Sequence, residues 1–285
     1  MRKLKKPTDL PKDVLLTCIS NYQSKELKKR LTSYTEEITK ASKIYEEKVK
    51  DTSLHTILVQ EEEEGIVRKS EMIKVYDDKF SKKGQPGRTY YDKLKAAPRL
   101  KKCPLCGYRI VSTLDHHLPK TKYPIFAVTP VNLIPACFDC NKIKEAANPK
   151  SAEEETLHPY FDDIETELWL EADVIVGNPI GFRFFVGKPT NWDEIKIKRV
   201  KHHFEFFDLG ELYSSYAAEE ISLRQYSLVN IYEKAGAKGV RAQLLDFKNS
   251  SERVYLNSWQ TAMYRALANS DWICCEGLNQ ELLYM

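Results

Sequence analysis

Hydrophobic residues recur at helical spacing along most of this chain. Between residues 24 and 50, a segment without Gly or Pro, the apolar positions Leu27, Leu31, Tyr34 and Ile38 are three or four residues apart, and lysine and glutamate fill much of the remainder. This spacing predicts an amphipathic helix with one buried face. The same kind of pattern predicts further helices over residues 70–80, 192–206, 212–235, 237–247 and 255–268.

Strand-forming residues are concentrated in the middle of the chain. Residues 108–114 are rich in β-branched side chains and lead directly into Asp115. Residues 126–131 predict a second strand, and residues 141–147 predict a short helix. The expected order is therefore strand, loop, strand and short helix. Farther along the chain, residues 181–186 form another strand candidate.

These elements predict an α+β protein with three segments. We expect a basic helical region over residues 1–100, a strand-containing module over residues 101–162, and a mostly helical, acidic region over residues 163–285. A chain of 285 residues is long enough for one large domain or two ordinary ones, and either can bury a hydrophobic core.

The net charge of +3 conceals an asymmetry along the chain. Residues 1–150 contain 31 Lys and Arg against 19 Asp and Glu, whereas residues 151–285 contain 13 against 22. The half that contains the module is therefore the basic half, which favours a polyanion such as nucleic acid as its partner. Well-solvated charged helices are the alternative explanation of the same composition.

The composition favours a cytoplasmic protein with no membrane association. The chain is 42% hydrophobic, and no apolar run approaches the roughly 20 residues that a membrane-spanning helix needs. The N-terminus is basic, but Asp13 interrupts the apolar positions that follow, so no signal peptide is expected. Seven cysteines do not suggest a secreted disulfide framework. Three of them, Cys18, Cys274 and Cys275, are interpreted as packing residues.

The other four cysteines form two Cys-x-x-Cys pairs. Cys103 and Cys106 make the first pair, and Cys137 and Cys140 make the second after an interval of 30 residues. Paired thiols at this spacing predict one tetrahedral, structural zinc ion, although the interval is longer than in common zinc ribbons. A redox role is disfavoured because no thioredoxin-like βαβ pattern surrounds the pairs.

A different set of side chains lies between and after the two pairs, namely Asp115, His116, Asn132 and Asn141. Hydrolysis of a phosphodiester requires a base that activates water and a cation that neutralises the charge developing on the phosphoryl oxygens. An imidazole suits the first task, and carboxylate and carboxamide oxygens suit Mg²⁺. Taken singly, each residue is a weak signal, because a histidine beside a cysteine pair is equally consistent with a zinc ligand or a core residue.

Together these residues make the chain resemble the HNH, or ββα-metal, endonucleases over about 60 residues. The shared pattern is Asp-His-x-x-Pro at Asp115–Pro119, Asn-Leu at Asn132, and Cys-x-x-Cys-Asn-x-x-Lys from Cys137 to Lys144. The resemblance implies a zinc-stapled ββα-metal core that cleaves DNA. It implies that Asp115 and Asn141 hold a catalytic Mg²⁺ or Mn²⁺ ion, that His116 is the general base, and that Asn132 braces the loop and orients His116. The last metal-ligand position is often His in the family and is Asn here.

The choice between His116 and His117 as the base is left open by periodicity. In a regular strand Asp115 and His116 point to opposite faces, whereas Asp115 and His117 share one face. Alternation alone therefore favours His117, and the resemblance favours His116 because the strand is expected to end or bend there. If His116 is the base, we expect His117 to contact the substrate or the metal.

Further residues are expected to contact the substrate. Lys120 and Lys144 suit phosphate, although a solvated lysine is the equally common alternative. His158 is expected to close over the module as a structural clamp rather than as a site residue. The sequence does not distinguish DNA from RNA, and DNA is favoured by the resemblance alone.

The wider layout resembles, more loosely, the HNH proteins that accompany an ATPase in bacterial anti-phage systems such as Septu. This likeness rests on the helices that precede the module and on Asn257-Ser258-Trp259 near the start of a late helix. It implies an ATPase partner and a role in antiviral defence.

Three alternatives compete with the nuclease hypothesis. The strongest is a non-catalytic zinc module that binds nucleic acid or a protein. A zinc-dependent nucleobase deaminase is rejected because no His-x-Glu or Cys-x-Glu precedes the second cysteine pair. A scaffold with a decayed nuclease site is disfavoured because all four motif positions carry competent side chains.

Overall fold

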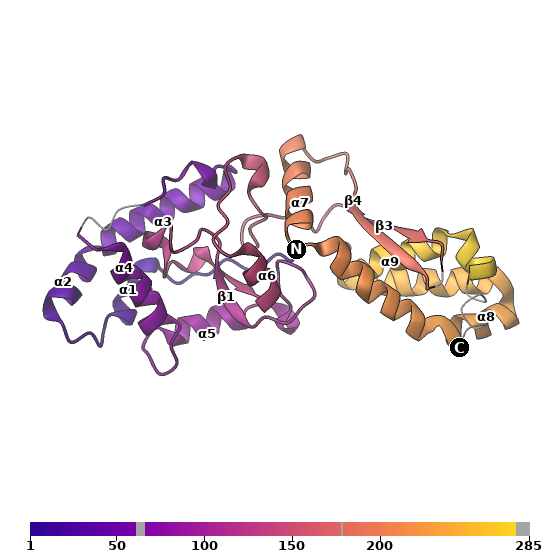
Figure 1. The fold of residues 1–285 in the computed structure, drawn as a ribbon, viewed down its shortest axis with the longest axis horizontal. Coiled ribbons are helices and arrows are strands. Elements are labelled where there is room, and N and C mark those ends of the chain that lie inside the picture. The colour runs from indigo at the N-terminus through magenta and orange to yellow at the C-terminus, as the bar shows by residue number, and fades with distance from the viewer. Residues whose placement is uncertain (61–65, 178, 278–285) are drawn as a thin grey trace. The chain divides into compact units, whose positions relative to one another are not determined.

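The computed structural model describes residues 1–60, 66–177 and 179–277 (Figure 1). The chain divides into two compact units, Met1–Asp163 and Ile164–Met285. This division falls one residue after the boundary expected between residues 162 and 163. The class is α+β and mostly helical, with two small sheets of two strands each among the described residues. No helix in the described ranges combines the length and apolar character needed to cross a membrane.

Helices are the main regular elements of the first unit. They are α1 (Pro11–Cys18), α2 (Lys25–Ser33), α3 (Thr35–Lys50), α4 (Lys69–Lys74), α5 (Arg88–Ala96) and α6 (Phe138–Lys144), with a π-helix over Val75–Phe80. The single helix predicted over residues 24–50 is thus two helices that meet at Tyr34. Hydroxyl groups at the junction bond back to helix carbonyls: Thr32 donates to the carbonyl of Lys28, and Thr35 to that of Thr32. Such bonds compete with the regular helical pattern and favour a break.

The helical region and the cysteine-containing module share their hydrophobic core. One buried cluster joins residues of α1–α5 to Leu114, Ala127, Val128 and Leu133 of the module. A second cluster packs Tyr45 of α3 against module residues such as Leu118, Tyr123 and Phe126. Residues 1–100 and 101–162, which were expected as separate segments, therefore fold as parts of one unit.

Two short antiparallel strands form the sheet of this unit. β1 (Thr113–His116) pairs with β2 (Leu133–Ala136), with Asp115 opposite Ile134 and His116 opposite Leu133. The prediction of a strand over residues 126–131 is wrong, because this region forms 3₁₀ turns over Pro124–Phe126 and Pro130–Asn132. Each turn begins at a proline, whose fixed φ suits the turn and whose missing N–H cannot join a strand ladder.

The second unit contains the other sheet and the longest helix. β3 (Leu170–Ile175) pairs antiparallel with β4 (Gly181–Val186), and they are followed by α7 (Glu194–Phe206), α8 (Leu209–Val254), α9 (Trp259–Asn269) and a π-helix over Ile273–Gly277. Phe184 of β4 contacts the ring of Tyr213 on α8, with ring centroids 5.7 Å apart. α8 is kinked at Gly236, where φ is 61°. This kink falls in the gap between the helices predicted over residues 212–235 and 237–247.

Asn257 ties the start of β3 to the turn before α9. Its side-chain oxygen accepts hydrogen bonds from the backbone N–H groups of Trp169 (2.8 Å) and Leu170 (3.1 Å). Its amide group donates to the carbonyl of Glu167 at 2.7 Å. The Asn257-Ser258-Trp259 motif therefore has a structural explanation within the second unit.

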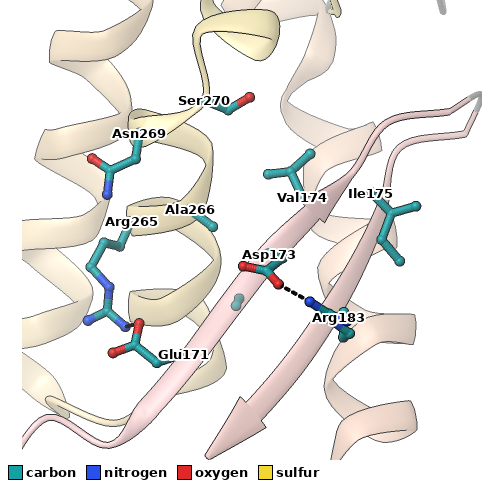
Figure 2. A pocket seen from close by; sticks show the side chains of 10 residues that line it. Glu171, Asp173, Val174, Ile175, Arg183, Arg265, Ala266, Asn269 and Ser270 are labelled. Carbon is teal, nitrogen blue, oxygen red and sulfur yellow. Dashed lines mark hydrogen bonds and ion pairs between the residues drawn. The ribbon is translucent and has the colours of Figure 1, made fainter. Parts of the chain in front are cut away.

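A pocket of about 730 Å³ lies beside β3 in this unit (Figure 2). Its charged groups are paired with one another. Asp173 forms an ion pair with Arg183 at 2.5 Å, and Glu171 with Arg265 at 2.8 Å. Because the opposite charges neutralise each other, the pocket offers no obvious preference for an ionic ligand. The candidate chemistry lies in the first unit.

Candidate metal centre and neighbouring side chains

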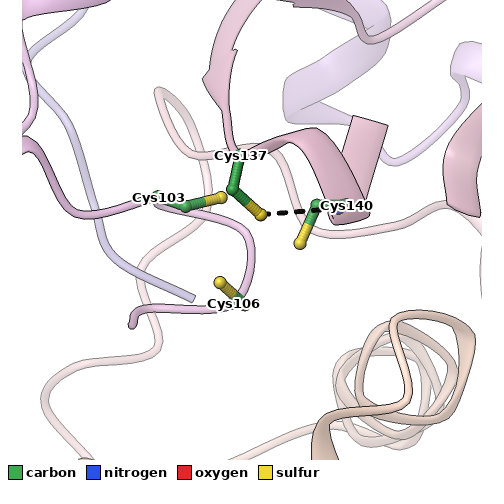
Figure 3. A group of neighbouring side chains, drawn as sticks. All are labelled: Cys103, Cys106, Cys137 and Cys140. Atoms are coloured by element: carbon green, nitrogen blue, oxygen red, sulfur yellow. Dashed lines mark hydrogen bonds between the residues drawn. The ribbon is translucent and has the colours of Figure 1, made fainter. Parts of the chain in front are cut away.

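The four predicted cysteines come together in one buried cluster. The sulfur atoms of Cys103, Cys106, Cys137 and Cys140 all lie within 4.8 Å of one another (Figure 3). Four sulfurs bound at about 2.3 Å to one tetrahedral zinc ion would lie about 3.8 Å apart, so a small contraction would complete such a site. The geometry and the all-sulfur donor set are consistent with structural zinc.

Each pair is held by its own backbone turn. Gly107 adopts a positive φ of 72° after the first pair, and the N–H of Arg109 points to the sulfur of Cys106 at 3.4 Å. In the second pair, the sulfur of Cys137 caps α6 by accepting from the N–H of Cys140 at 3.4 Å. An ion pair between Arg109 and Asp139 (3.1 Å) links the two turns. N–H donors near sulfur favour thiolates, the form that binds metal.

Contacts among the sulfurs distribute protons unequally within the cluster. Hydrogen bonding with Cys103 lowers the pKa of Cys106 and of Cys137, and raises the pKa of Cys140. Four buried thiolates repel one another, so full deprotonation requires a compensating cation. The cluster therefore couples metal binding to proton release.

Asp115 lies on the face of β1 that contacts α6. It is buried, and its Oδ2 lies 3.3 Å from the Nζ of Lys144, an ion pair without hydrogen-bond geometry. This oxygen accepts no hydrogen bond from the described residues. Burial raises the pKa of Asp115, and the charge of Lys144 opposes that shift. Asn141 precedes Lys144 by three residues on α6, so the two side chains share a helix face. The structure thus places Asp115 against the helix face that carries Asn141.

His116 points to the opposite side of the strand. Its Nε2 lies 2.9 Å from the carbonyl oxygen of Ala127, and its ring lies against Tyr76 with centroids 4.3 Å apart. A carbonyl only accepts, so Nε2 carries the proton and Nδ1 of the neutral ring keeps its lone pair. Burial lowers the pKa of His116 to about 3, which favours this neutral form. The side chains of Asp115 and His116 therefore do not share one face, as strand alternation predicts.

His117 follows the end of β1 and belongs to a different cluster. Its backbone N–H donates to the carbonyl of Asn132 at 2.8 Å. Its ring lies 4.4 Å from that of His158, centroid to centroid. His158 is fully buried, and its Nε2 is 3.1 Å from the hydroxyl of Tyr45. His158 thus connects α3 to the module, in agreement with a structural role.

Asn132 braces the loop between the two strands. Its Oδ1 accepts from the N–H of Leu118 at 2.7 Å, and its Nδ2 donates to the carbonyls of Leu118 (3.0 Å) and Phe126 (3.3 Å). The side chain is fully buried, and no hydrogen bond joins it to the imidazole of His116. Its effect on His116 is therefore indirect, through the loop that ends at Ala127.

We expect Asn132→Ala to lower the free energy of unfolding by about 3 kcal/mol, because it removes three buried hydrogen bonds and leaves the N–H and the carbonyl of Leu118 without their side-chain partner. Denaturant unfolding followed by circular dichroism measures the change. Asn148→Ala is the control, since Asn148 is partly exposed and accepts one side-chain hydrogen bond, from Tyr123 at 2.9 Å. Its expected cost is under about 1 kcal/mol. Equal effects of the two variants would contradict the bracing role.

The two predicted substrate lysines have different surroundings. Lys144 is only 4% exposed and donates to the carbonyl of His116 at 2.6 Å. Lys120 retains 23% of its side-chain exposure, forms an ion pair with Asp77, and has its Nζ 4.5 Å from the ring centroid of Tyr76. Tyr76 and Asp77 were not identified from the sequence, where they read as part of an ordinary helix over residues 70–80.

The fold and the cluster define a mostly helical α+β protein whose first unit contains a buried four-cysteine site that could bind zinc. The chain is 31% identical over 224 residues to Protein ea31 of Escherichia phage lambda, a match that covers 73% of this chain and 74% of that protein. The chain therefore belongs to the family of Protein ea31. No family model matches the chain, and no solved structure matches it.

Proposed function

We propose that this protein is a metal-dependent endonuclease of the HNH type that hydrolyses phosphodiester bonds in DNA. The observation that carries the proposal is the packing of β1, β2 and α6 into one unit. In this unit Asp115 lies beside Lys144 of α6, the helix that also carries Asn141, and His116 follows on the opposite face of the same strand with its Nε2 bonded to a carbonyl. The ion and the base would therefore have to reach one phosphate at the end of this short strand. A carboxylate, a carboxamide and a neutral imidazole are the groups that this chemistry needs.

His116 is assigned the role of general base. Because its Nε2–H is bonded to Ala127, Nδ1 is the atom that can take a proton from a water molecule attacking phosphorus. Burial keeps the ring neutral but also opposes its protonation, and the hydrogen bond to the Ala127 carbonyl offsets part of that effect by stabilising the cation. The attacking water thus becomes more nucleophilic, and the proton stays on His116.

Asp115 and Asn141 suit a hard divalent ion such as Mg²⁺ or Mn²⁺. Oδ2 of Asp115 has no hydrogen bond from the described residues, and the Asn141 side chain makes none with them. Their oxygens are the donors that these ions prefer. When bound, the ion supplies charge that stabilises the phosphoryl oxygens during cleavage. The charge of Lys144 opposes the rise that burial causes in the pKa of Asp115, and Lys144 ties α6 to β1 through the carbonyl of His116.

Zinc in the four-cysteine cluster has a separate, structural role in this proposal. Cys137 and Cys140 open α6, and Ser112 immediately before β1 donates its N–H to the carbonyl of Ala136 at 2.9 Å. Fixing the cysteines therefore fixes α6 against β1. Lys120, which is partly exposed, and His117 are the proposed substrate contacts. Lys144 is buried, so contact with phosphate would require a rearrangement.

The wider setting is also a proposal. We infer that the protein acts in the cytoplasm beside an ATPase partner in antiviral defence, and this inference rests on the sequence layout alone. Co-expression with an ATPase encoded next to it, followed by affinity purification, tests the partnership. Recovery of the protein alone, with unchanged nuclease activity in the presence of the ATPase, would refute it.

The nuclease proposal is tested with supercoiled plasmid and purified wild-type protein. We expect nicked and linear DNA with Mg²⁺ or Mn²⁺, and intact plasmid when the divalent ion is omitted or EDTA is added. Zinc content is measured in the same samples, so that loss of structural zinc is not mistaken for loss of the catalytic ion. A single-stranded RNA substrate tested in parallel shows which nucleic acid is cleaved. Retarded but uncut DNA with every cation would instead support a non-catalytic zinc module.

A further inference from the structure

The N-terminal helical region reaches the candidate catalytic histidine through Tyr76. Tyr76 lies on the π-helix that follows α4, a helix form that is rare and often found at functional sites. Its ring is buried and stacks on Phe80 of the same π-helix, with centroids 5.4 Å apart. The edge contact with His116 spans 40 residues of sequence and brings the rings to 4.3 Å at an interplanar angle of 64°.

The same aromatic ring contacts the exposed lysine of the candidate site. The ammonium nitrogen of Lys120 lies 4.5 Å from the ring centroid of Tyr76, within the range of a cation–π interaction. Asp77, the next residue of the π-helix, forms an ion pair with Lys120. One turn of the helical region therefore touches both the candidate base and a candidate phosphate contact.

We propose that Tyr76 is a positioning residue that holds the His116 imidazole and the Lys120 ammonium in their working positions. This inference rests on the proposed nuclease function and extends it, because it makes the helical region part of the catalytic site. In this case the ββα module is not complete by itself, and the helical region is more than an extension of it. The module lacks one of its supports until residues 75–80 pack on it.

The His116 ring needs a contact such as Tyr76 because a single hydrogen bond from the described residues holds it in place. The bond from Nε2 to Ala127 fixes one ring atom, but the ring can still tilt about that bond and move Nδ1. The edge of Tyr76 blocks this tilt. A displacement of about 1 Å at a reacting atom can cost on the order of 100-fold in rate. Lys120 has a long flexible side chain, and the aromatic ring and Asp77 together restrict where its charge lies.

The competing explanation is that Tyr76 only fills the core. Its hydroxyl makes no hydrogen bond with the described residues, so Tyr76→Phe preserves both ring contacts. Tyr76→Leu removes the ring and keeps much of the apolar volume. Phe80→Leu is the comparison variant, because Phe80 is fully buried on the same π-helix and its ring contacts are with Tyr76 and Tyr91 and not with His116.

Steady-state cleavage of plasmid tests the proposal, with all three variants compared at equal fractions folded. We expect Tyr76→Phe to retain kcat within about threefold, and Tyr76→Leu to lose about 10- to 100-fold in kcat with a rise in KM. Phe80→Leu should change neither by more than about threefold. Equal losses in Tyr76→Leu and Phe80→Leu would show that the ring serves the core alone and would overturn the proposal.

A second measurement does not depend on cleavage. Two-bond ¹H–¹⁵N NMR spectra of the side chain report which ring nitrogen of His116 carries the proton. We expect one tautomer, protonated at Nε2, in wild type and all three variants, because the bond to Ala127 persists. The ring signals should stay sharp in wild type, Tyr76→Phe and Phe80→Leu, and broaden in Tyr76→Leu because the ring can then tilt. Equally sharp ring signals in Tyr76→Leu would overturn the positioning role. If Tyr76→Leu broadens the signals and yet neither wild type nor any variant cuts DNA, the nuclease proposal fails and the positioning contact stands.

Discussion

Replacing Cys140 with serine is expected to abolish zinc binding and unfold the first unit. Cys140 is fully buried on α6, and its sulfur is one of four that converge in the cluster. Structural zinc contributes about 10–16 kcal/mol of apparent binding free energy in small zinc domains. Whole domains are stable by only roughly 5–15 kcal/mol. Losing one of four thiolates therefore removes a contribution as large as the net stability of the unit.

The loss of structure in Cys140→Ser should extend beyond residues 101–162, because these residues share a hydrophobic core with helices α1–α5. Leu114 and Leu133 of the two strands lie in the same buried cluster as residues of α1 and α5. Hydrogen exchange monitored by mass spectrometry is therefore expected to show lost protection in α1–α5 as well as in α6. Metal analysis of the purified variant should find zinc well below one ion per chain.

Cys275→Ser is the matched control for this prediction. Cys275 is an exposed thiol outside the cluster, so its replacement should leave zinc content and the melting temperature unchanged. Should Cys140→Ser retain one zinc ion and melt within a degree or two of wild type, the sulfur of Cys140 is not needed to hold the metal or the fold. Three remaining sulfurs and a water molecule would then have to be sufficient for the fold.

The helices and the cysteine cluster could be predicted because each leaves a local signal. Leu27, Leu31 and Ile38 recur at the helical period, and each lies on a face that is buried at least in part. The two Cys-x-x-Cys pairs have a spacing typical of metal ligands. A four-sulfur metal site then requires only that the fold brings the two pairs together. The break at Tyr34 was missed because it arises from hydroxyl-to-backbone bonds that do not alter the apolar pattern.

The second strand could not be located from periodicity. All four residues of Leu133–Ala136 are buried, so the period-two alternation that marks a half-exposed strand is absent. Pro135 also lies within it, opposite Leu114, and a proline usually argues against a strand interior. The segment over residues 126–131 is richer in β-branched residues, yet Pro124 just before it and Pro130 within it direct the chain into turns. The position of β2 is instead determined by its pairing with β1 and by the turn of residues 137–140 that follows it. Both are tertiary effects.

In the candidate site, too, local features could be predicted from the sequence and tertiary contacts could not. Alternation along β1 predicts that Asp115 and His116 point to opposite faces, and the structure has them so; Asn132 bonds to the loop between the strands but not to His116 among the described contacts. The partners of His116 were not predicted. One is the backbone carbonyl of Ala127, which any residue could supply. The other is Tyr76, which is brought in by packing of a distant helix. The burial of Lys144 was missed for a similar reason, because its charge is matched by Asp115 only in the folded chain.

The His116→Ala variant is expected to bind DNA, retain its zinc and lose cleavage by about 10²- to 10⁴-fold, the usual contribution of a general base. The ion pair of Asp115 with Lys144 and the four-cysteine cluster do not involve the imidazole, so the unit should stay folded. Plasmid cleavage with Mg²⁺, DNA retardation in a gel and a thermal melt are measured on the same preparation.

The decisive comparison is His117→Ala. Its ring contacts His158 and lies outside the contact between His116, Ala127 and Tyr76, so we expect a loss of no more than about tenfold. A reversal, in which His117→Ala abolishes cleavage and His116→Ala is nearly normal, would mean that the base shares the face of Asp115. In that case the anchored imidazole of His116 would be a core residue, and the cation and the base would both act from the α6 side of β1. The two variants thus determine which face of a four-residue strand carries the chemistry.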